Sequence, residues 1–349
     1  MKRIYMNSFD DWGCGHYRAK LPVLNCYSDM REKGVNLILE RELHSNECYY
    51  DAYILHRCPV ENSIFFMQTI QKNGKKFVLE IDDDIFNIPE WMPSDEYKNP
   101  KWSLKRAVDM CDEIWAATPT LAATFNKPEK TYVLPNLVDC NSFLESQPHT
   151  DQIRILWMGS MWHDRDIDQL TNPVIRIIKE FGDKVQFLFW GCLPTAFADY
   201  NRIPGQNMAV LTQKKDFGAS LIYLEGLPFK FYYDRLIKLG PCIGLAPLYD
   251  CTFNDSKSNL KYLEYTMAGA ATIACDLLPY KCIENEVDGL LVEPHDENGW
   301  YEAIKRMIED NDLRNKLVSN AQSKVRELYS WHSKEKRDLW VNAFERLVK

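Results

Sequence analysis

The chain has 349 residues, 46% of them hydrophobic, and a formal net charge of −8. This length predicts two domains. The apolar content, with 10 Trp, 18 Tyr and 16 Phe residues, is enough for two packed cores and excludes a disordered chain. The acidic balance disfavours a protein whose whole surface binds nucleic acid.

The 11 cysteines are scattered and form no Cys-x-x-Cys pair, which argues against a disulfide framework and against a structural zinc site. Reduced thiols are typical of the cytoplasm. No apolar run approaches the ~18 residues of a membrane span, and residues 1–11 lack the apolar core of a signal peptide. We therefore expect a cytoplasmic protein without a transmembrane segment.

Strand and helix patterns alternate along the first half of the chain. This alternation predicts a doubly wound parallel sheet, which binds ligands at the carboxyl ends of its strands. The expected strands are Lys2–Met6, Val35–Leu39, Ala52–His56, Lys76–Ile81, Ile114–Ala117 and Thr131–Leu134, and the expected helices are Tyr17–Lys33, Phe65–Asn73, Trp102–Cys111 and Pro119–Asn126, the last capped by Thr118.

The first strand leads into a glycine-containing turn, Gly13-Cys14-Gly15-His16-Tyr17-Arg18. Two glycines at this place suit a loop whose backbone approaches a ligand closely. Arg18 occupies the place of the third glycine of a dinucleotide fingerprint, so a nicotinamide site is disfavoured. His16 and Arg18 then have two interpretations: side chains that contact a ligand, or a loop histidine and a surface ion pair.

Two further strand ends carry polar residues. His56 ends one strand, and Asp82, Asp83 and Asp84 follow another. Clustered carboxylates need a cation, a hydrogen-bond network or exposure to water. A metal site is possible here, but no second group of metal ligands accompanies them. Asp82 is either a base or a hydrogen-bond partner for a ligand hydroxyl, whereas Asp83 and Asp84 also suit an exposed acidic loop or a helix N-cap.

The second half begins after a polar linker predicted at Phe143–Gln152. Its first strand, Ile153–Met158, ends in Gly159-Ser160, and Arg165 follows. A Gly-Ser turn with a nearby guanidinium suits a phosphate oxygen. Segment 194–215 is poorly periodic and suggests an insertion.

A helix is expected to open near Ser256–Ser258, directly after a loop that follows the strand Ile243–Ala246. Helical spacing places Lys257, Lys261 and Glu264 on one polar face, and Leu260, Leu263 and Met267 on a buried stripe. The free amides and the dipole of a helix start favour an anion such as a diphosphate. The other interpretation is a capped surface helix with Lys–Glu pairs.

The stretch FNDSKSNLKYLEYTMAG, residues 253–269, resembles the donor-binding segment of GT-B-type glycosyltransferases, in particular relatives of glycosyltransferase family four. The resemblance continues to Leu291, and the turn at residues 13–18 is similar to a loop of the same group. In that family the second Glu of a spaced pair binds the nucleotide ribose, and Glu264 matches it. Ser256 stands where the first Glu is expected, so this chain is a variant of the motif.

The resemblance implies an α/β fold of two Rossmann-like doubly wound domains facing a cleft. Residues 1–148 would bind the acceptor, residues 149–330 the nucleotide sugar, and residues 331–349 would form a helix that crosses back to the first domain. It also implies a metal-independent hexosyl- or pentosyltransferase that moves a sugar from a nucleoside diphosphate sugar, first of all a UDP-sugar, to an acceptor hydroxyl with retention. No permanently bound cofactor is expected.

Together, the patterns and the resemblance give three sets of candidate residues. Relatives often have a His near the position of Asp82, which makes that residue the acceptor-side candidate. The catalytic candidates are Asp82, His16, Arg165 and Lys257; the donor-binding candidates are Gly15, Gly159, Ser160, Arg165, Lys257, Ser258, Asn259, Leu260, Lys261 and Glu264; the acceptor-binding candidates are Arg18, His56, Asp82 and Asp83.

Two alternatives remain open. One is a degenerate GT-B protein that holds a nucleotide sugar or a glycan without turning it over, which Ser256 favours and the intact polar face disfavours. The other is a transferase that acts on hydroxymethylated bases in viral DNA. The basic residues Lys98, Lys101, Lys105 and Arg106 favour DNA, and the overall acidic charge argues against it.

Overall fold

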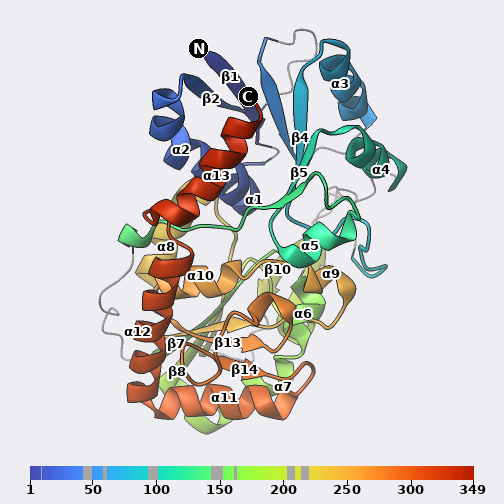
Figure 1. The fold of residues 1–349 in the computed structure, drawn as a ribbon. Coiled ribbons are helices and arrows are strands. Elements are labelled where there is room, and N and C mark those ends of the chain that lie inside the picture. Colours follow the sequence, from blue (N-terminus) through green and yellow to red (C-terminus); the bar gives the residue numbers. More distant parts are fainter. Residues whose placement is uncertain are drawn as a thin grey trace. The chain divides into compact units, whose positions relative to one another are not determined.

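The computed structural model describes residues 1–8, 10–41, 49–57, 61–92, 101–142, 152–160, 163–202, 209–213 and 220–349. The chain divides into two compact units, and neither is one continuous segment (Figure 1). The first unit consists of Met1–Cys140, Asp255–Ser258 and Arg326–Lys349. The second unit consists of Asn141–Asn254 and Asn259–Val325. Each unit is built on its own parallel sheet.

The sheet of the first unit has six parallel strands in the order β2-β1-β3-β4-β5-β6. The chain turns from one side of the sheet to the other between β1 and β3, and this switch point is where doubly wound sheets bind ligands. The strands are β1 (Lys2–Asn7), β2 (Val35–Glu40), β3 (Ala52–His56), β4 (Lys76–Ile81), β5 (Glu113–Ala116) and β6 (Thr131–Val133).

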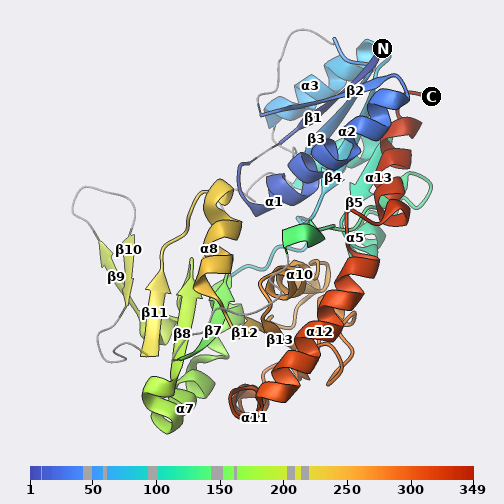
Figure 2. The ribbon, with the colours of Figure 1, turned by 90° about the vertical axis from the view of Figure 1, so that its left-hand side faces the viewer.

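Helices cover both faces of this sheet, because alternate residues of the buried strands point to opposite sides. Residues such as Ile4 pack with α2 and α13 on one face, and Tyr5 packs with α3 and α4 on the other. Figures 1 and 2 show α2 and α13 side by side. The helices are α1 (Gly13–Gly15), a π-helix (His16–Lys20), α2 (Leu21–Glu32), α3 (Glu61–Lys72), α4 (Lys101–Met110), α5 (Pro119–Thr124) and α13 (Lys334–Arg346).

The sheet of the second unit also has six parallel strands, in the order β11-β8-β7-β12-β13-β14. Its switch point lies between β7 and β12. The strands are β7 (Ile153–Met158), β8 (Val185–Trp190), β11 (Leu221–Leu224), β12 (Ile243–Ala246), β13 (Ala271–Cys275) and β14 (Leu290–Val292). The two sheets confirm the predicted class, an α/β fold with two Rossmann-like domains.

The helices of the second unit include a short α10 that follows the loop after β12. Segment 194–215, expected as an insertion, contains an antiparallel pair, β9 (Ala198–Arg202) and β10 (Ala209–Gln213). The remaining helices are α6 (Asp164–Asp168), α7 (Thr171–Phe181), α8 (Tyr232–Leu239), α9 (Thr252–Asp255), α10 (Leu260–Met267), α11 (Glu297–Glu309) and α12 (Asn311–Leu328), with 3-10 turns at Cys140–Ser142, Gly182–Lys184, Thr195–Phe197, Phe229–Phe231 and Leu278–Tyr280.

The predicted start of the helix near Ser256–Ser258 is wrong. The chain ends α9 at Asp255, and α10 begins at Leu260, so Lys257 precedes the helix rather than lying on it. The predicted amphipathic pattern is also wrong, because every residue from Tyr262 to Met267 is buried, Glu264 included. A helix surrounded by packed chain does not need a polar face, and spacing alone could not reveal this.

The predictions of a helix cap at Thr118 and of a domain linker have different outcomes. The cap at Thr118 is confirmed, since its Oγ1 accepts a hydrogen bond from the Leu121 amide at 3.1 Å. The linker placed at Phe143–Gln152 falls almost entirely on residues 143–151, outside the described part, as do Lys98 and the side chain of Lys101. Among the described helices, none combines the length and the apolar content that crossing a membrane requires.

Candidate active site

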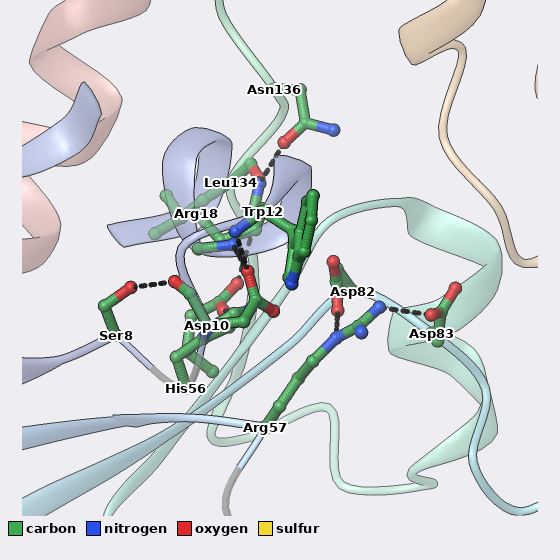
Figure 3. A network of polar contacts seen from close by, with 12 residues as sticks. Ser8, Asp10, Trp12, Arg18, His56, Arg57, Asp82, Asp83, Leu134 and Asn136 are labelled. Atoms are coloured by element: carbon green, nitrogen blue, oxygen red, sulfur yellow. Dashed lines mark hydrogen bonds and ion pairs between the residues drawn. The ribbon is translucent and has the colours of Figure 1, made fainter. Parts of the chain in front are cut away.

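The turn after β1 is held by its own side chains. The Asp10 carboxylate accepts hydrogen bonds from the amides of Trp12 (2.8 Å) and Gly15 (3.0 Å), and the Ser8 hydroxyl donates to the Asp10 carbonyl at 2.7 Å (Figure 3). A Cβ atom on Gly15 would lie 2.0 Å from that carbonyl oxygen. Packing of the turn therefore accounts for Gly15 without a ligand, and it fixes the start of α1 at the end of β1.

A buried ionic network lies under this turn, where β3 and β4 end. Arg18 donates through Nε to Glu80 at 2.7 Å and through Nη1 to the Leu134 carbonyl at 2.7 Å and to the Asn136 side chain at 3.0 Å. His56 Nε2 lies 3.6 Å from Glu80. Arg18, His56 and Glu80 are each at most 1% exposed, so in this conformation they hold the site together rather than line it.

Burial decides the charge states of this network. It raises the pKa of Glu80 to about 7, although the Arg18 guanidinium opposes the rise. It also lowers the pKa of His56 to about 3. Burial, followed by the charge of Lys20, lowers the pKa of His16 to about 4. Both histidines are therefore neutral at neutral pH, and neither can donate a proton as an imidazolium there.

Arg57 organises the acidic residues that follow β4. Its guanidinium pairs with both Asp82 and Asp83 (Figure 3), and its backbone has the unusual φ of 48°. Burial alone would raise the pKa of Asp82, but the Arg57 charge and a hydrogen bond from Cys14 hold that pKa well below its usual range. Asp82 is thus a carboxylate at every physiological pH, which suits an acceptor of hydrogen bonds better than a base.

The segment Asp255–Ser258, which precedes α10, packs within the first unit. The Thr118 hydroxyl donates to the Ser256 carbonyl at 2.9 Å, Asn136 Nδ2 donates to Ser258 Oγ at 2.9 Å, and Lys257 Nζ lies 3.8 Å from Asp83. The Ser256 hydroxyl is fully buried, and the described residues offer it no hydrogen-bond partner. Lys257 and Ser258 are therefore tied to the acidic residues and to the buried network.

In the second unit, Asp166 joins the two loops at the switch point. It accepts hydrogen bonds from the Tyr249 amide (2.7 Å) and from Asn254 (2.9 Å), both after β12, and it contacts His163 at 2.6 Å on the β7 side. The neighbouring Arg165 is exposed, with its guanidinium 5.9 Å from the centre of the Tyr249 ring. Asp166 therefore fixes the short helix α6, to which the exposed Arg165 belongs.

The backbone comes unusually close to itself where β7 and β8 end. Gly191 has a φ of +97°, and a Cβ there would lie 2.2 Å from the Gly159 carbonyl oxygen. A Cβ on Gly159 would meet the Trp157 ring at 2.8 Å. Ser160 follows at the surface. The glycines are thus required for packing.

Helix α10 brings two candidate side chains into this unit. Lys261 lies with Nζ 5.8 Å from the centre of the Trp157 ring, and the buried Glu264 lies beside Tyr232 of α8, whose hydroxyl donates to Met158 Sδ at 2.9 Å. The Asn259 side chain does not cap the helix but donates to Cys282 Sγ at 3.3 Å, and Leu260 is the first helical residue. Trp157 Nε1 is buried without a hydrogen-bond partner in the described residues. Within the described residues, the N-cap side chain therefore leaves the amides at the start of α10 uncapped.

The fold of the whole chain is similar to that of solved glycosyltransferases. Sucrose-phosphate synthase from Thermosynechococcus elongatus has a TM-score of 0.68 at 12% identity, with 99% of each chain covered. HepE from Anabaena, in complex with UDP and glucose, has 0.66 at 11%, covering 99% of this chain and 100% of HepE. A glycosyltransferase from Rickettsia africae has 0.62 at 13%, covering 100% and 98%.

The chain has the GT-B fold. No model of a known protein family matches its sequence, and no curated protein does. At 11–13% identity these structures establish the fold of the chain and leave its activity open.

The structure groups the sequence-derived candidates into two sets, one in each unit. The first unit holds Gly15, His16, Arg18, His56, Asp82 and Asp83 together with Lys257 and Ser258, and the second holds Gly159, Ser160, Arg165, Asn259, Leu260, Lys261 and Glu264. Sequence reasoning gave no role to Arg57, Asn136, Asp166 and Tyr232. The hydrogen-bond partners of Arg57 and Asn136 lie 25 to 122 residues away along the chain. For Asp166, the only local signal was the polar run His163-Asp164-Arg165-Asp166. Within the described residues, no three His, Cys, Asp or Glu side chains gather as metal ligands would.

Proposed function

We propose that the protein transfers a sugar from a nucleoside diphosphate sugar to an acceptor hydroxyl. The observation that carries this proposal is the uncapped start of α10 at the β7/β12 switch point, in a chain with the GT-B fold. Doubly wound sheets bind nucleotides at such a switch point, and free helix amides favour a diphosphate. The buried, unpartnered Trp157 Nε1 beneath Lys261 is a second polar group in need of a partner there.

In this proposal the second unit binds the donor. The diphosphate meets the amides at Asn259 and Leu260 and the charge of Lys261, with Arg165 and the Gly159 turn contributing from the loop after β7. Glu264 accepts hydrogen bonds from the ribose hydroxyls. Departure of the nucleoside diphosphate leaves negative charge on its terminal phosphate, and preorganised amides and cations stabilise that charge in the transition state. A UDP-sugar is the first donor to test, because HepE binds UDP with glucose.

The first unit binds the acceptor in this proposal. Asp82 is ionised and partly accessible, with 11% of its side chain exposed, and it accepts a hydrogen bond from an acceptor hydroxyl. Arg57 holds it in place and shares its charge with Asp83. Arg18 and His56, which are at most 1% exposed, support this arrangement from below instead of touching the acceptor.

The proposal is tested by incubating the protein with UDP-, GDP- and ADP-sugars and measuring release of the nucleoside diphosphate. We expect release from one of them, and we expect Glu264→Ala to lower the rate at least 100-fold, since a buried carboxylate that orients the ribose is lost. Glu302→Ala is the matched control, because Glu302 is exposed on α11 of the same unit.

Two results would contradict the proposal. One is release of no nucleoside diphosphate from any donor; binding without release would instead indicate the degenerate binding protein. The other is equal activity of the Glu264→Ala and Glu302→Ala variants. We also propose retention of the anomeric configuration, on the strength of the motif resemblance, and the proton NMR coupling of the newly formed glycosidic bond reads it directly.

A further inference from the structure

The turn after β1 presents a tryptophan that the fold does not use. Trp12 is 57% exposed, and its indole makes no hydrogen bond or ring contact with the residues that the structure describes. It occupies the N-cap position of α1, where Ser, Thr, Asp or Asn is usual, and its side chain caps nothing. The Asp10 carboxylate accepts from the amides there instead. The ring therefore contributes neither to the core nor to the helix start.

The backbone that carries this ring is fixed on both sides. The Trp12 amide donates to the Asp10 carboxylate at 2.8 Å, and the Trp12 carbonyl accepts from the His16 amide at 3.0 Å. Only the two side-chain torsions of the indole remain to be ordered when a ligand stacks on it. A rigid aromatic ring of this kind binds at a small cost in conformational entropy.

The acidic residues that follow β4 lie next to this turn. Burial raises the pKa of the Cys14 thiol, and the charges of Arg57 and Asp82 act on it as well. Since Cys14 stands two residues after Trp12, the turn and the acidic residues are neighbours within the first unit. In Figure 3 the Trp12 ring projects from the turn on the side where Asp82 and Arg57 lie. An exposed aromatic ring and a group of carboxylates are thus presented together.

The charges of this group limit the chemistry of a ligand. Asp82 and Asp83 have 11% and 14% of their side chains exposed, and a carboxylate only accepts hydrogen bonds, so the ligand has to donate them. Arg57 pairs with both carboxylates, and Lys257 lies with Nζ 3.8 Å from Asp83. The two cations are balanced by the two carboxylates, and Asp10 adds a further negative charge. No positive excess is left to attract a phosphate.

We infer that the acceptor is a neutral sugar whose ring stacks on Trp12 while its hydroxyls donate to Asp82. A pyranose ring has an apolar face of C–H groups and a rim of hydroxyls, and an indole beside a carboxylate matches both. A nucleobase would also stack on the indole, but the phosphates of a nucleic acid would meet the carboxylates. The inference rests on the proposed function, in which Asp82 accepts the hydrogen bond of the acceptor hydroxyl.

The other interpretation is that Trp12 is an isolated surface aromatic, which is common in soluble proteins. Trp102 is the matched control for this interpretation, because it is 52% exposed on α4 of the same unit. If exposure alone explained Trp12, both tryptophans would behave alike toward a sugar. A sugar site requires that they differ.

The experiment uses saturation-transfer NMR to titrate the full chain with the methyl glycosides of glucose, galactose, mannose, xylose and N-acetylglucosamine, in the absence of a nucleotide sugar. We expect at least one glycoside to bind. Trp12→Ala should weaken that binding roughly three- to tenfold, the loss of one stacking contact. Trp12→Phe keeps an aromatic face and should weaken it less, and Trp102→Ala should bind as the wild type does. Thermal unfolding confirms that each variant folds.

The inference is overturned if none of these glycosides binds the wild type, or if the Trp12→Ala and Trp102→Ala variants bind the sugar equally. Binding of a DNA duplex that contains hydroxymethylated cytosine, in place of the glycosides, also overturns it and indicates the DNA acceptor. Release of a nucleoside diphosphate tests the proposed function separately. With release and no glycoside binding, the proposed function stands and the inference falls. In the reverse case the chain binds a sugar without transferring one, and the proposed function falls together with the acceptor role.

Discussion

Glu80 lies at the end of β4 with its carboxylate in the interior of the first unit. It is 0% exposed and has one cation, Arg18, within hydrogen-bond distance, while His56 beside it is neutral. Burial of an ionised carboxylate costs free energy even when it is paired, and this cost is what raises the pKa of Glu80 to about 7. Between about pH 4.5 and pH 7, Glu80 is therefore protonated in the folded protein, whereas in the unfolded chain, where its pKa is near 4.5, it has lost its proton.

This difference predicts how stability depends on pH. The stabilising contribution of the protonated Glu80 to the free energy of unfolding is fully present below about pH 4.5. It is lost as the pH rises to about 7, because only the folded state still binds the extra proton in that interval. Glu80→Gln removes the titration and keeps an oxygen for the Arg18 hydrogen bond. Between pH 5 and pH 7.5 we expect the wild type to lose ~1–3 kcal/mol more stability than the variant. Thermal unfolding at both pH values measures this, and identical pH dependence of the two proteins would refute it.

Among single residues, the sequence and the family resemblance indicated candidates for the site, but not the contacts around them. Asp82 and Glu264 were selected by residue type and by the resemblance, and the structure shows how each is held. Nothing in the sequence indicated the contact of Asn136 with Ser258 or that of Asp166 with Asn254, because these partners lie far away along the chain. The burial of Arg18 and His56 could not be predicted either, because no neighbouring residue in the sequence indicated that the fold would bury them.

At the scale of elements, the turns after β7 and β8 depend on two glycines that almost touch. Gly191→Ala would place a Cβ 2.2 Å from the Gly159 carbonyl oxygen, at a φ of +97° that L side chains rarely adopt. We expect a loss of ~2–4 kcal/mol in the stability of the second unit, measured by chemical denaturation. The control is Gly226→Ala, since nothing lies within 4 Å of its Cβ position. Equal stability of the two variants would contradict the prediction.

Predicted elements agreed with the structure where apolar strands alternate with helices, and failed where packing overrides local pattern. The helix expected from Ser256–Ser258 begins at Leu260, because Thr118, Asn136 and Asp83 hold the preceding backbone and side chains in a non-helical segment. The helix expected from Tyr17 begins earlier, at Gly13, and passes through a π-helix at His16–Lys20. Both deviations lie next to candidate site residues, where local preference is most often overruled.

At the scale of the whole molecule, the sequence predicted the fold class and two Rossmann-like domains. It could not predict that Asp255–Ser258 joins the first unit, because this fragment carries no compositional mark of belonging there. The C-terminal helix α13 completes the core of that unit. Trp340 is fully buried there, edge-on to Trp115 with ring centres 5.9 Å apart, and it donates to the Pro135 carbonyl at 3.3 Å.

Trp340→Ala is therefore expected to destabilise the first unit by ~3–5 kcal/mol, the cost of a large cavity under α13. Trp102→Ala is the control, because that ring is 52% exposed on α4 of the same unit. Chemical denaturation followed by the fluorescence of the remaining tryptophans measures both. A loss for Trp340→Ala no larger than for Trp102→Ala would show that the helix contributes little to this core.

The return of residues 326–349 to the first unit also has a consequence for synthesis on the ribosome. The strands β1 to β6 emerge first, yet the apolar face that Trp331, Trp340 and Phe344 cover stays open to water until these residues have been synthesised. The nascent polypeptide therefore carries an unprotected hydrophobic surface from the synthesis of β6 to that of α13, and that surface is where a chaperone would bind it.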